Sequence, residues 1–322
     1  MLKNKRIFIT GGAGFIGSHL VEQLIDNNEI VVYDTLHRNA LLAYTDLKSH
    51  KNLTFVQGDV LDAQMLAKNM KGSDIVVHLA SMAGVATIQK NPTRTLNINI
   101  FGTKNILEEC RKQGINRFIS YSTSEVYGPH IYQAKEDGMT TLGALGEPRW
   151  FYAMSKLSAE FLAYGYHLEH GIKFTSVRPF NIYGPRQIGV GAVHNFVVNA
   201  IKNEPLIVHT PGSQIRSWCY VSDIVDATLS ILERKKAEGE VFNIGDPLST
   251  STNIQTAETI IRLTKSKSKI IFQEIKSPDV HIRVPNIDKA KKLLDFEPKV
   301  HFEEGLQKTI EWYSKLPKDK LA

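Results

Sequence analysis

A tyrosine and a lysine, Tyr152 and Lys156, stand four residues apart at the start of a predicted helix, so both side chains share one helical face. A phenol with a pKa of about 10 is a poor base at neutral pH, but an ammonium group beside it favours the phenolate. Such a pair can take the proton of an alcohol while a hydride leaves the same carbon. The same spacing also arises by chance, as a packed aromatic ring beside a surface lysine.

Three polar residues, Thr123, Ser124 and Glu125, directly follow a predicted strand at 117–122. Ligands of open α/β sheets lie beyond the carboxyl ends of the strands, so we expect these side chains at the mouth of the sheet. Thr123 can hydrogen-bond to a hydroxyl that becomes a ketone, and Glu125 adds an acid or base. The alternative is that the hydroxyls cap a turn and that Glu125 is exposed.

Three glycines spaced by three, Gly11, Gly14 and Gly17, separate an apolar strand at 6–10 from a predicted helix at 18–26. The first glycine allows a tight turn, the second a close approach of the backbone to a pyrophosphate, and the third close packing of the helix. The free N–H groups at the start of the helix then face the phosphates.

An acidic residue, Asp34, ends the second apolar strand at 30–34. A carboxylate about 20 residues after such a loop accepts a hydrogen bond from a ribose 2′-hydroxyl and disfavours a 2′-phosphate. The loop and the acid together predict a site for NAD rather than NADP. The alternative is a glycine-rich turn in a core strand, with a surface aspartate.

The composition argues against several classes of function. The chain has 322 residues, 42% of them hydrophobic and 22% charged, and a net charge of +6, which is ordinary for a globular protein. The mild positive excess does not predict nucleic-acid binding, and the sequence has no membrane-length apolar run and no metal-ligand spacing. Two distant cysteines, Cys110 and Cys219, fit a reducing cytoplasm. The first residues enter a strand at once, which predicts no signal peptide.

Apolar strands alternate with amphipathic helices, which predicts a doubly wound α/β fold with a parallel sheet covered on both faces. We expect a Rossmann domain over 1–180 that also receives a strand near 241–245, and a smaller, mostly helical substrate lobe over 181–322. Loops are expected at 184–191 and 211–217. Strands are predicted at 6–10, 30–34, 53–57, 75–79, 117–122, 173–178 and 241–244, and helices at 18–26, 63–70, 99–113, 153–170, 192–202, 222–234, 254–265, 288–294 and 302–315.

With these motifs the chain resembles the NAD-dependent epimerase/dehydratase family, extended short-chain dehydrogenases that act on nucleotide sugars, over essentially its whole length. Further motifs that carry the resemblance are Gly58-Asp59-Val60, His78-Leu79-Ala80, Asn99-x-x-Gly102-Thr103, Arg178-Pro179-x-Asn181-x-Tyr183-Gly184-Pro185, Gln214-x-Arg216 and Tyr220-Val221-x-Asp223-Ile224. The resemblance implies that NAD takes a hydride from C4 of a nucleotide-linked sugar, while Tyr152 takes the proton of the 4-hydroxyl.

The resemblance also implies which residues contact the ligands. Uridine is the default nucleotide by resemblance, with guanosine, cytidine and thymidine as alternatives. The implied NAD contacts are Gly11, Gly14, Phe15, Ile16, Gly17, Asp34, Asp59, Val60, Leu79, Ala80, Ser81, Asn99, Tyr152 and Lys156. The implied substrate contacts are Met82, Asn181, Val193, Arg216 and Arg283, of which the two arginines would grip the diphosphate. Helices 99–113 and 153–170 resemble those through which family members pair, so a homodimer is expected.

The reaction that follows C4 oxidation is less specifically indicated. The runs Thr123-Ser124-Glu125-Val126-Tyr127-Gly128 and Pro148-Arg149-Trp150-Phe151-Tyr152 resemble UDP-glucuronate decarboxylases, and we predict that reaction. Loop 81–88 departs from the resemblance, because it has no aromatic residue where decarboxylases usually carry a tyrosine. A 4,6-dehydratase, a 4-epimerase and a non-catalytic NAD-binding sensor remain as alternatives.

Overall fold

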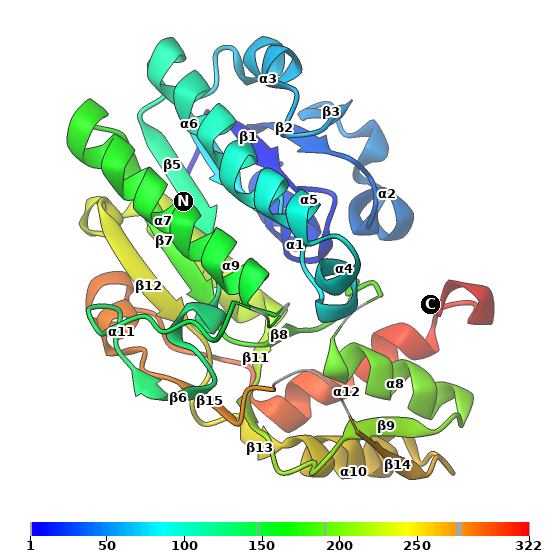
Figure 1. Cartoon of the computed structure of the whole chain (residues 1–322). Coiled ribbons are helices and arrows are strands. Elements are labelled where there is room, and N and C mark those ends of the chain that lie inside the picture. Colours follow the sequence, from blue (N-terminus) through cyan, green and yellow to red (C-terminus); the bar gives the residue numbers. More distant parts are fainter. Residues whose placement is uncertain (1, 146, 148, 190, 275–278, 322) are drawn as a thin grey trace.

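The computed structural model in Figure 1 describes residues 2–145, 147, 149–189, 191–274 and 279–321, apart from the side chains of residues 85, 86 and 318. Its centre is a sheet of seven parallel strands in the order β12-β7-β5-β4-β1-β2-β3. The strands are β1 (Arg6–Thr10), β2 (Glu29–Asp34), β3 (Leu53–Gln57), β4 (Ile75–His78), β5 (Arg117–Tyr121), β7 (Lys173–Pro179) and β12 (Glu240–Ile244).

The strand predictions are confirmed to within one residue at each end, and the late strand pairs with β7 at the sheet edge. The strands are apolar along nearly their whole length because helices cover both faces of the sheet. One face carries α1 (Phe15–Leu24), α2 (Ala40–Tyr44), α9 (Val221–Glu233) and α11 (Asp288–Leu294). The other face, in front in Figure 1, carries α3 (Ala63–Met70), α6 (Gly102–Gln113) and α7 (Trp150–His170).

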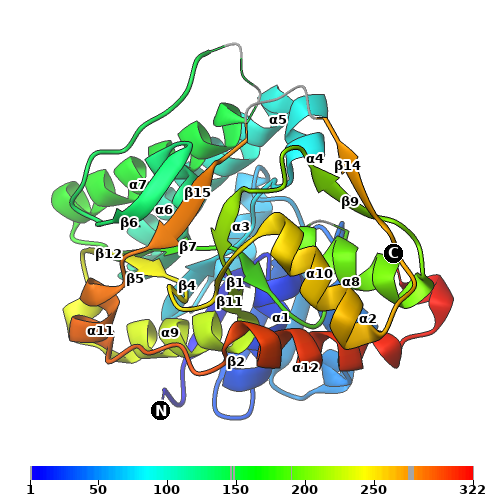
Figure 2. The same ribbon diagram turned by 90° about the horizontal axis from the view of Figure 1, so that it is seen from below.

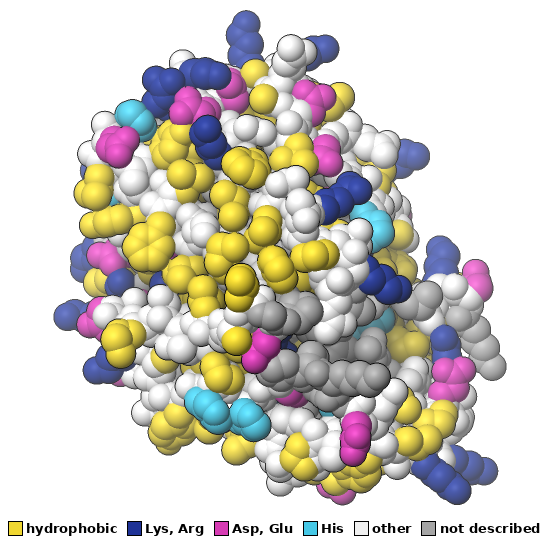
Figure 3. Space-filling model, viewed as in Figure 1, with side chains coloured by type: hydrophobic (Ala, Val, Ile, Leu, Met, Phe, Trp, Pro, Cys, Tyr) yellow, Lys and Arg dark blue, Asp and Glu magenta, His cyan; other side chains and the backbone are white. Residues whose placement is uncertain are grey.

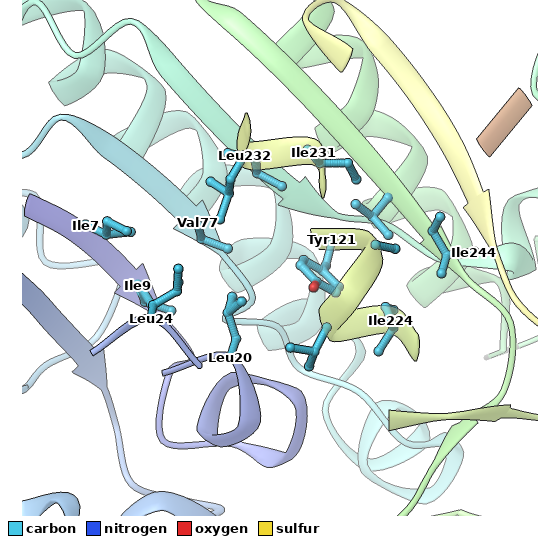
Figure 4. Close-up of a cluster of buried hydrophobic side chains, with 14 of the residues drawn as sticks. Ile7, Ile9, Leu20, Leu24, Val77, Tyr121, Ile224, Ile231, Leu232 and Ile244 are labelled. Atoms are coloured by element: carbon cyan, nitrogen blue, oxygen red, sulfur yellow. The ribbon is translucent and has the colours of Figure 1, made fainter. Parts of the chain in front are cut away.

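The largest apolar core lies between the sheet and α1 and α9. Figure 4 shows Leu20 and Leu24 of α1 close to Val77 of β4, with Ile224 and Ile231 of α9 beyond them. These side chains are fully buried or nearly so. The sheet and these helices therefore form a rigid base from which the strand ends project.

Some predicted helix boundaries are wrong where the helices meet the strand ends. α1 begins at Phe15 rather than at residue 18, because the extended backbone of Gly14 already serves as its N-cap. α7 begins at Trp150 rather than at residue 153. The helix predicted at 99–113 opens with a π-helical stretch, η2 (Asn97–Phe101), before α6. Periodicity locates the interior of a helix better than its ends.

The smaller lobe combines three helices, α8 (Ala192–Lys202), α10 (Asn253–Thr264) and α12 (Phe302–Ser314), with several short strands. A four-stranded sheet has the order β13-β10-β15-β6, and two-stranded ladders join β9 to β14 and β8 to β11. The strands are β6 (His130–Ala134), β8 (Ile182–Tyr183), β9 (Leu206–His209), β10 (Ile215–Ser217), β11 (Cys219–Tyr220), β13 (Thr250–Thr252), β14 (Ile270–Gln273) and β15 (Ile282–Pro285). The loop predicted at 211–217 thus ends in a strand, which is too short for apolar alternation to reveal.

The chain passes between its two parts more than once. β6 precedes residue 180 but joins the lobe sheet beside β15, whereas α9, β12 and α11 follow residue 180 and belong to the central sheet and its cover. Figure 2 shows β15 and β6 side by side and α8, α10 and α12 grouped in the lobe. The division of the chain into two domains at residue 180 stays a prediction.

Shorter helical elements complete the described chain. They are α4 (Val85–Lys90), α5 (Pro92–Leu96) and the 3-10 turns η1 (Leu47–Ser49), η3 (Ser124–Tyr127), η4 (Lys235–Ala237) and η5 (Lys318–Lys320). Among the helices within the described ranges, none has the length and apolarity needed to span a bilayer. Over the same ranges, no three side chains of His, Cys, Asp or Glu gather as they would around a metal ion.

Candidate active site

The carboxyl ends of β1, β2 and β4 open into a cleft of about 900 Å³. The cleft lies where the strand order reverses, because the chain runs from β1 to β2 and β3 on one side and to β4 and β5 on the other. Such a switch point is the usual ligand site of a doubly wound sheet. The predicted ligand contacts that line it are Gly11, Gly14, Phe15, Ile16, Gly17, Asp34, Asp59, Val60, Leu79, Ala80, Ser81, Met82, Tyr152 and Lys156.

The glycine loop leaves no room for side chains. A Cβ atom on Gly11, whose φ is +71°, would stand 2.5 Å from the backbone N of Ala80, and one on Gly17 would stand 2.5 Å from the carbonyl O of Gly11. Gly14 provides no side-chain cap for α1, and the first turn of α1 holds no acidic residue. The N–H groups at this helix start are therefore available to a phosphate.

Asp34 is fixed beside this loop. Its carboxylate accepts hydrogen bonds from the backbone N–H of Ala13 at 3.1 Å and of Leu36 at 2.8 Å. Burial raises the pKa of Asp34, while these hydrogen bonds act in the opposite direction. Asp59 and Val60 line the same end of the cleft. A glycine-lined helix start beside an aspartate fits the diphosphate and adenine ribose of NAD.

Asp34→Asn is expected to weaken NAD binding about tenfold and to narrow the preference for NAD over NADP, because the amide oxygen keeps one of the two backbone hydrogen bonds but the negative charge is lost. Fluorescence titration of the purified variant with each dinucleotide measures both affinities. An unchanged ratio of the two affinities would contradict the role of Asp34 in cofactor choice.

Tyr152 and Lys156, on the first turns of α7, both line the cleft. Burial raises the pKa of Tyr152 to about 12, the charge of Glu125 adds to this effect, and side-chain hydrogen bonds with Ser81 and Thr123 oppose it. Burial lowers the pKa of Lys156 to about 8. The groups of the chain alone therefore leave the phenol protonated at neutral pH, and a phenolate needs further positive charge in the cleft.

Asn99 does not line the cleft but ties its wall to α7. Its Oδ1 accepts hydrogen bonds from Ser81 Oγ at 3.1 Å and from the backbone N of Met82 at 3.0 Å. Its Nδ2 donates to Ser155 Oγ at 2.9 Å, and this hydroxyl donates to the carbonyl O of Tyr152 at 2.8 Å. Asn99 lies in the π-helical stretch η2, a type of distortion that is frequent at functional sites.

A buried polar cluster extends from Thr123 and Glu125 into the smaller lobe. Thr123 Oγ1 caps η3 by accepting from the backbone N of Glu125 at 3.2 Å. The Glu125 side chain is only 14% exposed and pairs with Arg149 at 2.9 Å and with Arg283 at 3.3 Å. The alternative of an exposed Glu125 is therefore wrong. The adjacent Ser124 is fully buried.

The predicted substrate residues of the lobe fall into two groups. Asn181, Arg216 and Arg283 join the cluster, since Arg283 donates to Asn181 Oδ1 at 3.4 Å and the side chains of Arg216 and Arg283 are 9% and 8% exposed. Val193 instead packs in the apolar core of the lobe, 2% exposed, and its contact with substrate stays a prediction. Pro148, part of the decarboxylase resemblance, lies outside the described residues.

A model of the NAD dependent epimerase/dehydratase family matches residues 7–245 of the chain. The chain belongs to this family. Membership agrees with the doubly wound fold and the cleft at its switch point, and NAD is the cofactor of the family. The cofactor predicted from the glycine loop and Asp34 is thereby confirmed.

Several named enzymes match over nearly the whole chain. A UDP-N-acetyl-alpha-D-glucosaminuronate decarboxylase from Bacillus cytotoxicus is 35% identical, over 98% of this chain and 99% of its own. UDP-glucuronic acid decarboxylase 3 from Arabidopsis thaliana is 38% identical over 94% of this chain and 87% of its own. The structure of UDP-glucuronic acid 4-epimerase from Bacillus cereus, in complex with UDP-glucuronic acid and NAD, has a TM-score of 0.87 and 30% identity, covering 95% of this chain and 98% of that chain.

Three further residues belong to the site, although sequence analysis gave none of them a role. Arg38 lines the cleft and donates to the carbonyl O of Ala83 at 3.2 Å. Arg149 and Asp279 belong to the polar cluster. Of these three residues, only Arg149 could have been inferred from the sequence, because it stands three residues, almost one helical turn, before Tyr152.

Proposed function

We propose that the protein decarboxylates a UDP-linked hexuronic acid through a 4-keto intermediate. The observation that carries this proposal is the full-length similarity to enzymes named as decarboxylases of two different UDP-hexuronates. The cluster around Glu125 supports it, because its three buried arginines, paired with Glu125 and Asp279, suit a substrate with a carboxylate and a diphosphate.

Each residue then has a stated task in the reaction. NAD, when bound, accepts the hydride from C4 and later returns it. Tyr152 takes the proton of the 4-hydroxyl, and Lys156 stabilises the phenolate. The resulting ketone is β to the C6 carboxylate, so the C5–C6 bond breaks, its electron pair moves to the ketone, and carbon dioxide leaves. One proton from solvent adds to C5, and Tyr152 returns its proton to O4. Glu125, as a carboxylate, accepts a hydrogen bond from the sugar.

The test is to incubate the purified protein and NAD separately with UDP-glucuronate, UDP-N-acetylglucosaminuronate and UDP-glucose, and to read the products by mass spectrometry. A product lighter than one of the uronates by the mass of carbon dioxide supports the proposal and also identifies the substituent at C2. Loss of water from UDP-glucose, or no change with any of the three, contradicts it.

A 4-epimerase is the second candidate. It is favoured by Met82, which lines the cleft in the loop that lacks the aromatic residue usual in decarboxylases, and by the similarity to a UDP-glucuronic acid 4-epimerase structure. An epimerase needs no group beyond Tyr152, Lys156 and the cofactor after C4 oxidation. In the same assay it would give a product of unchanged mass with a new chromatographic position.

We also propose a homodimer that forms through α6 and α7. Figure 3 shows apolar side chains gathered over these two helices. Phe101 of η2 is 53% exposed, and Phe161, Tyr164 and Leu168 of α7 are 67%, 45% and 66% exposed. An apolar patch of this kind on a soluble protein marks an interaction site.

Phe161→Glu is expected to convert the dimer to a monomer, because it buries a charge at the centre of the proposed interface. Light scattering after size-exclusion chromatography measures the mass. Phe272→Glu is the matched control, because Phe272 is 50% exposed but lies on β14 in the smaller lobe. A wild-type monomer, or a dimer that persists in the Phe161→Glu variant, would contradict the proposed interface.

The proposed compartment is the cytoplasm. Both cysteines, Cys110 and Cys219, are buried free thiols, as is usual for proteins of a reducing compartment.

A further inference from the structure

The polar cluster beyond Tyr152 holds more positive than negative charge. Arg149, Arg216 and Arg283 supply three guanidinium groups, and Glu125 and Asp279 supply two carboxylates. All five side chains are less than one fifth exposed. A buried excess of one positive charge favours the binding of an anion.

The two arginines beside Glu125 differ in their hydrogen bonds, although each leaves its Nε without a partner. Arg149 Nη2 donates a hydrogen bond to Glu125 Oε1 at 2.9 Å. Arg283 Nη2 stands 3.3 Å from the same oxygen, but neither its Nη2 nor its Nε makes a hydrogen bond. The Arg283 side chain is only 8% exposed, so these unpartnered donors are buried. A bound oxyanion would satisfy these donors and draw Arg283 away from Glu125.

Arg149 is anchored on a second side as well. Its Nη1 donates to Asp279 Oδ1 at 3.1 Å, and the same oxygen accepts from Arg216 Nη2 at 3.1 Å and from the backbone N of Val280 at 2.8 Å. One guanidinium thus joins the start of α7, the turn that follows β5 and the segment that leads into β15. Arg149 can keep its place when Arg283 moves.

We propose that Arg149 is a positioning residue, which holds the Glu125 carboxylate beside Tyr152 while Arg283 turns to an oxyanion of the bound substrate. Arg149 acts only through Glu125 and does not itself touch the reacting atoms. The inference rests on the proposed function only in requiring an anionic nucleotide sugar as the substrate.

The proposal has a consequence for the pH profile. Burial raises the pKa of Glu125, but the charges of Arg149 and Arg283 outweigh burial and hold it below its usual value. Tyr152 on α7 and Arg216 on β10 also face this carboxylate. When Arg283 binds the substrate, Arg149 remains as the cation paired with Glu125, while Arg216 stays paired with Asp279. Removing Arg149 raises the pKa of Glu125. On acidification, activity that needs the ionised carboxylate therefore begins to fall at a higher pH than in the wild type.

The test measures kcat and KM across pH for the wild type, Arg149→Gln and Arg149→Lys, with UDP-glucuronate or whichever nucleotide sugar the wild type turns over. We expect Arg149→Gln to lower kcat about 100-fold. In the plot of kcat against pH, the acidic limb, where activity falls on acidification, should move upward by about one pH unit. UDP affinity, measured by calorimetry, should stay near the wild-type value. Arg149→Lys should keep the limb in place, because it keeps the charge. Arg262→Gln, which removes an exposed partner of Glu303, is the control.

A double-mutant comparison gives a second test. If Arg149 acts through Glu125, adding Arg149→Gln to Glu125→Gln lowers kcat little further. An unmoved acidic limb in Arg149→Gln, a full additional loss in the double variant, or a joint loss of NAD and UDP affinity overturns the proposal. If the wild type acts on a nucleotide sugar whose hexose is uncharged, without releasing carbon dioxide, the proposed function fails. The diphosphate of that substrate still supplies the oxyanion for Arg283, so the same comparison with that sugar tests Arg149 independently.

Discussion

Tyr152→Phe is expected to lower kcat by about 10³- to 10⁴-fold, because it removes the hydroxyl that exchanges a proton with the sugar. The ring stays in place at the start of α7, so NAD and UDP should bind within about twofold of the wild-type affinity. The measurement combines kcat from product formation with titrations of NAD and UDP. The nicotinamide absorbance shows whether any sugar-driven reduction of NAD remains.

Tyr164→Phe is the matched control, since Tyr164 lies on the same helix and is 45% exposed. It removes an equivalent hydroxyl outside the cleft, and the ring stays in the proposed dimer face, so kcat should be unchanged. A Tyr152→Phe variant with nearly full activity would end the assignment of Tyr152 as the base. A wild-type protein that binds NAD but never reduces it with any nucleotide sugar would instead favour the non-catalytic sensor.

The parts of the site that sequence analysis predicts are those whose geometry follows from local spacing. Gly11, Gly14 and Gly17 form one turn between a strand and its helix, and Tyr152 and Lys156 share a helical face. Parallel strands end at one edge of the sheet. Residues that end a strand or come shortly after one, such as Asp34 of β2 and Ser81 after β4, can therefore be predicted to share a cleft without any knowledge of side-chain packing.

The parts that could not be predicted depend on partners distant in the sequence. Glu125, Arg149 and Arg283 come from three separate segments, and no spacing rule shows that they meet. Sequence analysis noted Arg178 only as part of a motif. Its partner Glu160 lies on an ordinary amphipathic helix, and nothing in the sequence predicted that the two side chains pair. Such pairs depend on the packing of α7 against β7, which periodicity does not specify.

The second large effect is expected on the stability of the fold when the buried pair of Arg178 and Glu160 is broken. Arg178 Nε donates to Glu160 Oε1 at 3.0 Å and Nη2 donates to Oε2 at 2.7 Å, with side chains 6% and 7% exposed. Glu160→Gln keeps the shape but leaves a buried guanidinium without its counter-charge. We expect a loss of about 3–5 kcal/mol in the free energy of unfolding, measured by urea denaturation.

Glu304→Gln is the control, because its pair with Lys308 is half exposed and should contribute less than about 1 kcal/mol. A double variant, Glu160→Leu with Arg178→Met, should be more stable than Glu160→Gln, since it leaves no unpaired charge in the core. Equal losses in Glu160→Gln and Glu304→Gln would refute this account of the pair.

The pair also supports the active site. Arg178 Nη1 donates to the hydroxyl of Tyr127 at 2.6 Å, and that hydroxyl donates to Asn243 Oδ1 at 2.9 Å. Tyr127 ends η3, the short turn that carries Glu125. Glu160→Gln should therefore lower kcat even at temperatures where the variant is fully folded, because η3 loses part of its anchor. Full activity in the folded variant would show that η3 is held by its other contacts and that the pair acts on stability alone.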